Sequence, residues 1–295
     1  MLVFSVHTRI DLRAAIRNTW GSVVENGSWP VSGSIGRSVK LLFLFGRSDS
    51  SLGNTVVREE SALYGDIVQG DFRESYYNLT LKSVMGIRWV ALYCPKAKFI
   101  LKADDDVFIH VKNLIDFLEI DNNRPQEAIY GRELKKGVVH RTGRWAVDKA
   151  AFSLNEYPTY VPGNSYVVSG SIAARIDFIA GVLPYINIED AFVTGIIRKI
   201  LGIKIVNGVG FTHWYEKQPK PCEFHNKVRI SATKVTEGLL YELWEGLKRN
   251  ITDCYVIPKD ESGRMGLGNI GFRNNIMFRD DHVFLNRSSG QFYVL

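Results

Sequence analysis

The sequence has few cysteines and no long hydrophobic run. Three cysteines, Cys94, Cys222 and Cys254, occur in 295 residues. They are too widely spaced for a zinc site, which normally has paired ligands a few residues apart, and they allow one disulfide and a free thiol. No stretch of about 18 apolar residues could span a bilayer. The opening segment, MLVFSVHTRIDLR, has an apolar run that is too short for a signal peptide. We therefore expect the chain as given to be soluble.

The sequence also lacks clusters of basic residues. Its net charge is +6, but the lysines and arginines are scattered. This distribution favours a solvated surface over a polyanion-binding face, so we expect no nucleic-acid partner, although a local pocket for a diphosphate remains compatible with it. No Gly-rich phosphate loop of the Walker type is present, which makes a nucleotidyl or phosphoryl transferase the least favoured enzyme class.

The apolar content of 45% is enough for a sizeable core. In the first half, short apolar runs alternate with segments of helical period, which predicts an α/β fold with a mostly parallel sheet. Asp11 is the expected N-cap of the first helix. Predicted strands are 2–6, 39–45, 66–68, 98–103 and 107–109, and predicted helices are 11–20, 54–64, 78–93 and 111–118.

The second half is less regular. Residues 145–163 are rich in aromatics, proline and turn formers, which predicts loop and edge strand. A strand is predicted at 166–169, and helices are predicted at 171–182, 191–201 and 236–249. Residues 256–295 have no clear period.

Three consecutive aspartates, Asp104, Asp105 and Asp106, follow the predicted buried strand 98–103. They would sit at the carboxyl end of a strand, where open α/β sheets bind ligands. Their mutual repulsion is unfavourable unless a cation compensates it. Alternate residues of an extended segment point the same way, so Asp104 and Asp106 could share one hard divalent cation while Asp105 turns aside. A solvated turn is the alternative.

A second acidic pair, Glu189 and Asp190, stands just before the apolar helix predicted at 191–201. Carboxylates at a helix N-terminus can simply cap it. A carboxylate beside an apolar wall can also act as a general base that accepts a proton from an incoming hydroxyl. The sequence leaves both interpretations open.

Basic, aromatic and histidine residues supply further candidates. Arg13 and Arg17 lie four apart on one helix face, with Trp20 beyond them, and could hold a pyrophosphate and a base. A salt-bridged surface helix is the more common outcome. His213 with Trp214, and His225, are candidate third ligands or acceptor contacts, although isolated histidines are usually structural.

Four sequons occur, at Asn26, Asn78, Asn250 and Asn286. They matter only in a secretory compartment.

Taken in order, several segments resemble glycosyltransferase family 31, the β-1,3-galactosyl- and N-acetylglucosaminyltransferases. The resemblance covers about residues 2–249. Its matching segments are RAAIRNTWG (13–21), LLFLFG (41–46), YGDIVQGDFRESYYNLTLK (64–82), CPKAKFILKADDDVFI (94–109), YPTYVPGNSYVVSG (157–170) and IEDAFVTGI (188–196).

The resemblance implies a GT-A type nucleotide-sugar transferase fold and a UDP-sugar donor with Mn²⁺ or Mg²⁺. It implies a single catalytic domain, 1–255, with a nucleotide-binding half (about 1–110), an acceptor-binding half (about 111–255), and a C-terminal extension at 256–295. The implied activity is inverting transfer of galactose or an N-acetylhexosamine to the 3-hydroxyl of an acceptor glycan. A catalytically silent relative that binds glycans or acts as a chaperone is the alternative.

The resemblance also assigns roles to residues. Asp104 and Asp106 would bind the metal, and Asp190 would be the base. Donor contacts would come from Arg13, Arg17, Trp20, Asp66, Lys102, Asp104 and Asp105, and acceptor contacts from Trp145, Tyr157, Tyr160, Tyr166 and Glu189.

The sequence departs from the family pattern in its closing motif. Thr233 stands where a histidine is common, which would leave water, His213 or His225 to complete the metal site. The family's N-terminal signal anchor, which would hold the protein on the lumenal side of the Golgi membrane, is missing from this chain.

Overall fold

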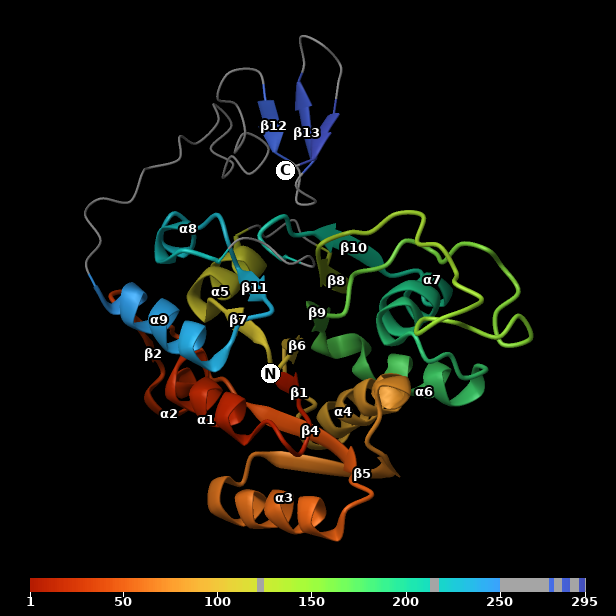
Figure 1. Cartoon of the computed structure of the whole chain (residues 1–295), viewed down its shortest axis with the longest axis horizontal. Coiled ribbons are helices and arrows are strands. Elements are labelled where there is room, and N and C mark those ends of the chain that lie inside the picture. Colours follow the sequence, from red (N-terminus) through yellow and green to blue (C-terminus); the bar gives the residue numbers. More distant parts are fainter. Residues whose placement is uncertain (121–124, 213–217, 250–275, 279–282, 287–291, 295) are drawn as a thin grey trace.

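The computed structural model describes residues 1–120, 125–212 and 218–249, together with the backbone of 276–278, 283–286 and 292–294. A seven-stranded mixed sheet runs through it in the order β10-β8-β9-β6-β1-β4-β5 (Figure 1). Its strands are β1 (Leu2–Phe4), β4 (Leu42–Arg47), β5 (Ile67–Arg73), β6 (Phe99–Asp104), β8 (Ala128–Gly131), β9 (Ser165–Ser169) and β10 (Lys204–Asn207). The predicted fold class, α/β with a mostly parallel sheet flanked by helices, is confirmed.

Helices connect and cover these strands. They are α1 (Ile10–Asn18), α2 (Val23–Asn26), α3 (Ser51–Tyr64), α4 (Leu79–Tyr93), α5 (Val111–Glu119), α6 (Ala173–Val182), α7 (Arg198–Ile200), α8 (Pro221–His225) and α9 (Glu237–Lys248). Shorter 3₁₀ turns are η1 (Trp20–Ser22), η2 (Tyr76–Asn78) and η3 (Gly170–Ile172), and η4 (Ala191–Ile197) is a π-helix.

Smaller strand pairs complete the fold. β2 (Ser28–Trp29) pairs with β3 (Gly33–Ser34), and β7 (Val107–Ile109) pairs with β11 (Ser231–Thr233). Near the end of the chain, β12 (Ile276–Phe278), β13 (Val283–Asn286) and β14 (Phe292–Val294) form an antiparallel sheet.

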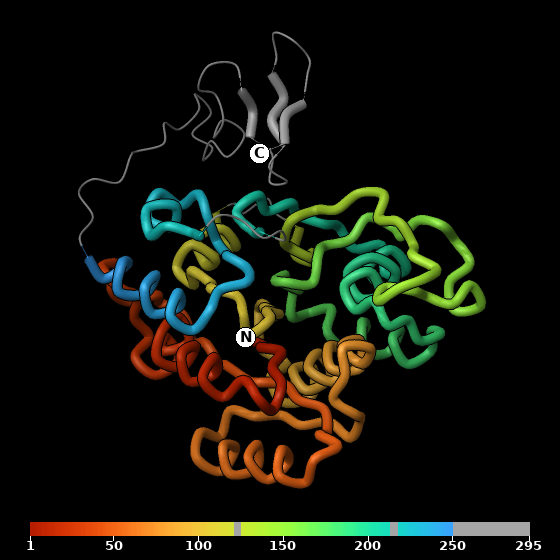
Figure 2. The backbone as a smooth tube through the Cα atoms, in the orientation of Figure 1, coloured from red at the N-terminus to blue at the C-terminus, as the bar shows by residue number. Residues whose placement is uncertain are grey.

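The central sheet separates two hydrophobic cores. Successive strand residues point to opposite faces, so Val3 packs into one core while Leu2 and Phe4 pack into the other. The first core includes residues of α1, α5 and α9, and the second includes residues of α4, α6 and η4. Helices α1 and α9, which are far apart in sequence, pack side by side (Figure 2).

One strand of the sheet runs against its neighbours. β9 is antiparallel to β6 and β8, and Ser165 is the register partner of Ala103. The start of β9 therefore lies beside the end of β6, and the N–H of Asp104 donates to the carbonyl of Asn164 at 3.0 Å. This arrangement brings the loop before β9 to the edge of the sheet where the aspartate triplet stands.

The structure corrects two local predictions. Asp11 is not the N-cap of α1: the cap position is Arg9, with no side-chain cap bond, and Asp11 lies in the first turn. A carboxylate there still complements the helix dipole. The segment after Asp190 is helical as predicted, but it winds as the π-helix η4 before the short α7. Residues 145–163 form the predicted irregular loop, but the edge strand also predicted there is reduced to isolated bridges at Glu156 and Tyr160.

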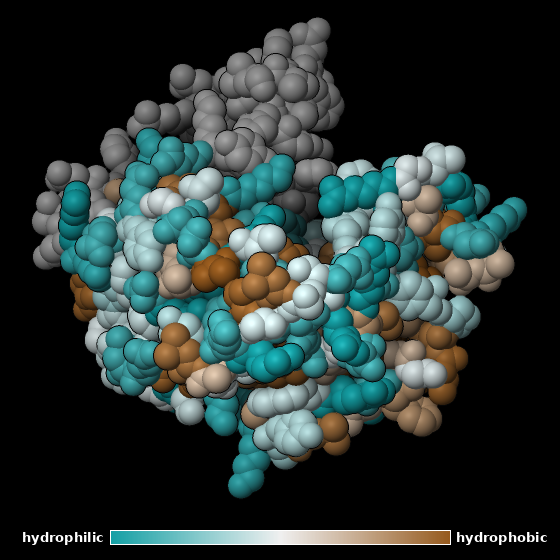
Figure 3. All heavy atoms as spheres, turned by 60° about the horizontal axis from the view of Figure 1, so that its bottom comes forward, coloured by the Kyte–Doolittle hydropathy of each residue, from teal (hydrophilic) through white to brown (hydrophobic). Residues whose placement is uncertain are grey.

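The surface mixes polar and apolar residues. On the face in Figure 3, hydrophilic and hydrophobic side chains are interspersed. No helix within the described ranges is long and apolar enough to cross a membrane. Cys222 forms a disulfide and Cys94 is free, whereas Cys254 lies outside the described residues.

Candidate active site

The aspartate triplet lies at the carboxyl end of β6, and its three side chains have different surroundings. The Asp104 side chain is 36% exposed and accepts a bond from Lys102 Nζ at 2.5 Å. Asp105 is buried, and its Oδ1 pairs with the guanidinium of Arg9. Asp106 is half-buried. Burial and, to a lesser extent, the charges of Asp104 and Asp105 together raise the pKa of Asp106 to about 6.

These carboxylates suit a divalent cation that is shared with a substrate phosphate. No cluster of three or more histidine, cysteine or acidic ligands occurs in the part of the chain that the structure describes. Mg²⁺ and similar hard cations often take only one or two protein carboxylates and complete their coordination with waters and phosphate oxygens. Asp104 and Asp106 supply two such groups. Burial is the main cause of the raised pKa of Asp106, and the charges of Asp104 and Asp105, which a cation would offset, add to it.

Asp190 is held at the N-terminus of η4. Its Oδ1 accepts from the N–H of Ala191 at 2.8 Å, and its Oδ2 accepts from the N–H of Gly163 at 2.9 Å. Burial raises the pKa of Asp190, whereas these two backbone donors and the charge of Lys102 oppose the rise. Asp190 thus caps η4 and is also an oriented carboxylate with enhanced basicity, so the two interpretations of the sequence are compatible.

Lys102 links the two acidic regions. Its buried ammonium group contacts the Asp104 carboxylate and also donates to the carbonyl oxygen of Gly163. The same glycine gives its N–H to Asp190. Asp104 and Asp190 are therefore connected through the side chain of Lys102 and the backbone of Gly163. Both lie at the edge of the sheet where β6 ends.

Glu189 points into the core. Its side chain accepts a hydrogen bond from the Tyr166 hydroxyl at 2.6 Å, and that hydroxyl lies 3.1 Å from Ser83 Oγ. Burial raises the pKa of Glu189 to about 7, with Lys102 opposing the rise. Tyr166 and Glu189 are 1% and 6% exposed. This placement favours support of the neighbouring Asp190 over the predicted direct contact with an acceptor sugar.

The other predicted acceptor residues lie on the 145–163 loop. Trp145 is 52% exposed, and its indole N–H donates to the Tyr76 hydroxyl at 2.9 Å. Burial and, to a lesser extent, the negative charge of Asp190 together raise the pKa of Tyr157 to about 12. The pKa of Tyr160 is raised for the same two reasons. Both phenols therefore stand within electrostatic reach of Asp190, and Trp145 has a ring open to solvent.

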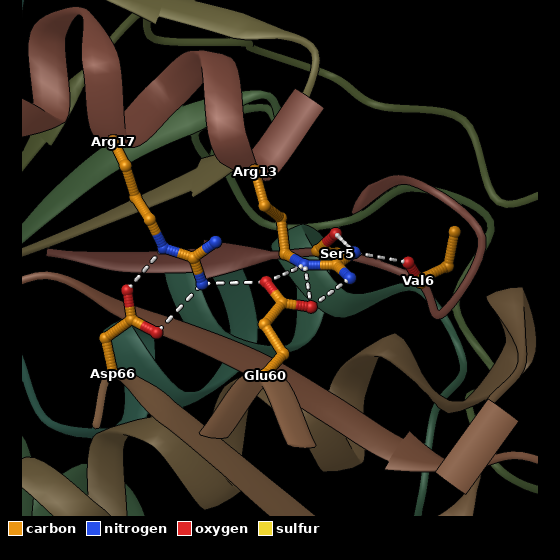
Figure 4. A network of polar contacts seen from close by, with 6 residues as sticks. All are labelled: Ser5, Val6, Arg13, Arg17, Glu60 and Asp66. Atoms are coloured by element: carbon orange, nitrogen blue, oxygen red, sulfur yellow. Dashed lines mark hydrogen bonds and ion pairs between the residues drawn. The ribbon is translucent and has the colours of Figure 1, made fainter. Parts of the chain in front are cut away.

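The predicted donor residues of the first helix face inward. Arg13 is fully buried, and its guanidinium donates to Glu60, to Ser5 Oγ and to the Val6 carbonyl (Figure 4). Arg17 forms a bidentate pair with Asp66 at 2.8 and 2.9 Å and also contacts Glu60.

The other two donor candidates are Trp20 and Asp66. Trp20 is fully buried in the core. Asp66 directly precedes β5, so it stands at the amino edge of the parallel strands, whereas the triplet stands at their carboxyl edge. This placement favours a structural role for Arg13, Arg17, Trp20 and Asp66 over direct donor contact, which stays a prediction.

The position of the missing family histidine lies close to the triplet. Thr233 is the register partner of Val107, and its Oγ1 accepts from Asn164 Nδ2 at 2.8 Å. His225 ends α8 and has a buried Nε2 without a partner in the described part of the chain. His213 and Trp214 lie outside the described residues.

Three features of the site escape sequence reasoning. Arg9 balances the charge of Asp105. Lys82 is buried and pairs with Glu74 at 2.7 Å. Gly163 donates to Asp190, and a Cβ at this position would stand 3.3 Å from Glu189 and 3.5 Å from Asp190. The only sequence signal for these contacts is that the residues fall in or beside the matched segments.

Comparison with known proteins gives consistent matches. The family model described as galactosyltransferase matches residues 11–208. The chain is 36% identical over 209 residues to "Beta-1,3-galactosyltransferase 5" of Homo sapiens, covering 70% of this chain and 64% of the relative. It is 34% identical over 249 residues to "Beta-1,3-galactosyltransferase 1" of Mus musculus, covering 84% and 73%.

A third relative is named for the transfer of a different sugar. The chain is 31% identical over 266 residues to "UDP-GlcNAc:betaGal beta-1,3-N-acetylglucosaminyltransferase 7" of Rattus norvegicus, covering 85% of this chain and 64% of the relative. The chain thus spans slightly less than two thirds of the length of two of these three relatives.

Proposed function

The chain belongs to the galactosyltransferase family, and from this premise we propose that it transfers a hexosyl residue from a UDP-sugar to the 3-hydroxyl of an acceptor glycan. The sugar is galactose or an N-acetylhexosamine, and the product is a β-1,3 linkage formed with inversion at the anomeric carbon. The names of the relatives support this reaction, since they describe β-1,3 transfer of galactose or N-acetylglucosamine.

The observation that carries the proposal is the connection between the two acidic regions. Asp104 and Asp190 are linked through Lys102 and Gly163. A donor held at the first carboxylate and an acceptor hydroxyl held at the second would therefore meet at one edge of the sheet. Direct displacement needs this juxtaposition and a single base.

Each acidic region has its own role in the proposed reaction. Asp104 and Asp106 would hold Mn²⁺ or Mg²⁺, which supplies Lewis-acid neutralisation of the leaving diphosphate when bound. Asp190 takes the proton of the acceptor hydroxyl; burial raises its pKa, and its two backbone donors fix its direction. Trp145 offers an open aromatic face to the acceptor.

The wider assignment follows from the family. We propose that residues 1–255 form one catalytic domain with donor and acceptor halves, and that 256–295 are an extension. The partners are a UDP-sugar and a glycan on protein or lipid. The setting is the Golgi lumen, with membrane attachment through an N-terminal anchor.

The test separates binding from transfer. With Mn²⁺ and a panel of UDP-sugars and β- and α-linked acceptors, Asp190→Asn should lower kcat by about 10²- to 10⁴-fold, because the base is lost, while UDP binding by calorimetry stays intact. Asp104→Ala should weaken UDP–Mn²⁺ binding itself. The control is Asp71→Asn, which changes a side chain that is 88% exposed. Retention of transfer by the Asp190→Asn variant would show that Asp190 is not the base.

A further inference from the structure

A buried lysine stands between the two acidic regions, and balancing charge does not account for all of its contacts. Lys102 lies two residues before Asp104 on β6, and it is 4% exposed. Its ammonium group contacts Asp104 Oδ1 at 2.5 Å and the Gly163 carbonyl oxygen. It also lies 4.4 Å from the centre of the Phe4 ring. A lysine is rarely buried in this way unless it is paired.

The peptide units around Gly163 carry this contact onward. The Gly163 carbonyl accepts from Lys102, and the Gly163 N–H donates to Asp190 Oδ2 at 2.9 Å. The next carbonyl, that of Asn164, accepts from the N–H of Asp104. The loop is therefore held from the strand side at two adjacent residues, and it in turn holds the Asp190 carboxylate.

We infer that Lys102 is a positioning residue that couples the metal side of the site to the base. It occupies Asp104 until a divalent cation takes over that carboxylate, and it fixes the Gly163 backbone that orients Asp190. A cation at Asp104 competes with one contact of the lysine and leaves the other in place, so the base stays aligned when the donor is bound. This inference rests on the proposed function, because it assigns Asp104 to the metal and Asp190 to the acceptor.

Another buried lysine nearby separates this role from simple charge balance. Lys82 on α4 is 1% exposed and pairs with Glu74 at 2.7 Å and with the Ser5 carbonyl at 2.8 Å. Neither contact of Lys82 touches Asp104 or Gly163. Lys102 differs in that its two contacts are the metal-side carboxylate and the loop that holds the base.

The coupling predicts two effects of opposite direction. Removing the ammonium group frees Asp104 from a competing cation, so Mn²⁺ should bind more tightly. The same change releases the Gly163 carbonyl, so Asp190 should lose alignment and transfer should slow. A lysine that only stabilised the fold would weaken both properties when it was replaced.

The primary experiment uses Lys102→Met, which keeps most of the length of the side chain without its charge. The control is Lys98→Met, the same substitution at an exposed position just before β6. Mn²⁺ affinity is measured by calorimetry without nucleotide, and kcat and KM are measured at saturating Mn²⁺. We expect about tenfold tighter Mn²⁺ binding and about tenfold lower kcat for Lys102→Met, with little change in the acceptor KM. Unchanged or weaker Mn²⁺ binding, or a kcat equal to that of Lys98→Met, would overturn the inference.

A pH profile and a second variant keep the test informative if Lys102→Met folds poorly. The charge of Lys102 lowers the pKa of Asp190, so its removal should move the acidic limb of the kcat profile to higher pH. Gly163→Ala leaves Lys102 in place but sets a methyl group 3.3 Å from Glu189 and 3.5 Å from Asp190. It should lower kcat by crowding the two carboxylates and leave Mn²⁺ affinity unchanged, because Lys102 and Asp104 are untouched; a change in Mn²⁺ affinity would contradict the assignment of the competition to Lys102.

Assays of the wild-type protein distinguish failure of the proposed function from failure of the proposed coupling by Lys102. Absence of transfer by the wild type with every donor refutes the proposed function, and the Mn²⁺ comparison between Lys102→Met and Lys98→Met then decides the competition at Asp104 alone. Transfer by the wild type together with identical behaviour of the two methionine variants refutes the coupling only.

Discussion

Replacing Arg13 by methionine should destabilise the fold without weakening donor binding. Arg13 is fully buried, and its guanidinium donates to Glu60 at 2.9 and 2.5 Å, to Ser5 Oγ at 3.1 Å and to the Val6 carbonyl at 2.8 Å. Those protein groups account for the orientation of the side chain. A donor diphosphate could reach the guanidinium only by displacing them.

The magnitude follows from the partner that remains. Breaking a buried ion pair by removing one partner costs about 3–5 kcal/mol. Arg17 still contacts Glu60 at 2.8 Å after the substitution, so the loss should lie near the lower value, about 3 kcal/mol. At roughly 2–4 °C per kcal/mol for a domain of this size, the unfolding midpoint should fall by about 6–12 °C.

The assay pairs thermal or urea unfolding with calorimetry of UDP–Mn²⁺ binding. The double variant Arg13→Met, Glu60→Leu should regain part of the stability, because replacing a whole buried pair by apolar groups is often neutral. An unchanged unfolding midpoint together with lost UDP binding would show that Arg13 contacts the donor, as the sequence motif suggested, and would refute the structural role.

Two further predictions concern the loop and acid stability. Trp145→Ala should raise the acceptor KM roughly tenfold and leave the unfolding free energy within about 0.5 kcal/mol, because the ring is 52% exposed; an unchanged KM would remove Trp145 from the acceptor site. Burial disfavours the charged form of Glu60, but hydrogen bonds from Arg13 and Arg17 outweigh it and lower the pKa of Glu60 below 4.5. Because the folded pKa is the lower one, this stabilisation is present above pH 4.5 and is lost as the pH falls further. Urea unfolding from pH 6 to 3 should show the loss, and Glu60→Gln should flatten it.

The sequence predicts most of the fold because its signals are local. The buried run at β4 and the segment KFILKA at β6 can be recognised from a few neighbouring residues, and both are strands. The aspartate triplet follows β6 directly, so its place at the carboxyl edge also follows from the sequence. The π-helix η4 was missed as such, since its wider winding leaves the apolar character of the segment unchanged.

The contacts of the site are harder to predict because they join distant parts of the chain. Arg13 meets Glu60 across 47 residues, and nothing near either of them marks the pairing. Tyr166 gave no sign of its inward orientation, because β9 is buried on both faces and shows no polar alternation. The resemblance to a family singles out candidate residues, and the three-dimensional structure shows which of them are buried among protein partners and which are open to solvent.

The reversed direction of β9 determines which loops are neighbours. β9 has five residues and rises roughly 3.3 Å per residue, so its first and last Cα atoms are separated by about 13 Å. Had this strand run parallel to β6, the turn that carries Gly163 would emerge at the far rim of the sheet, well beyond the reach of a lysine side chain. The orientation of β9 therefore sets the distance between Lys102 and Gly163. A rearranged topology that kept every residue but inverted this strand would separate the two.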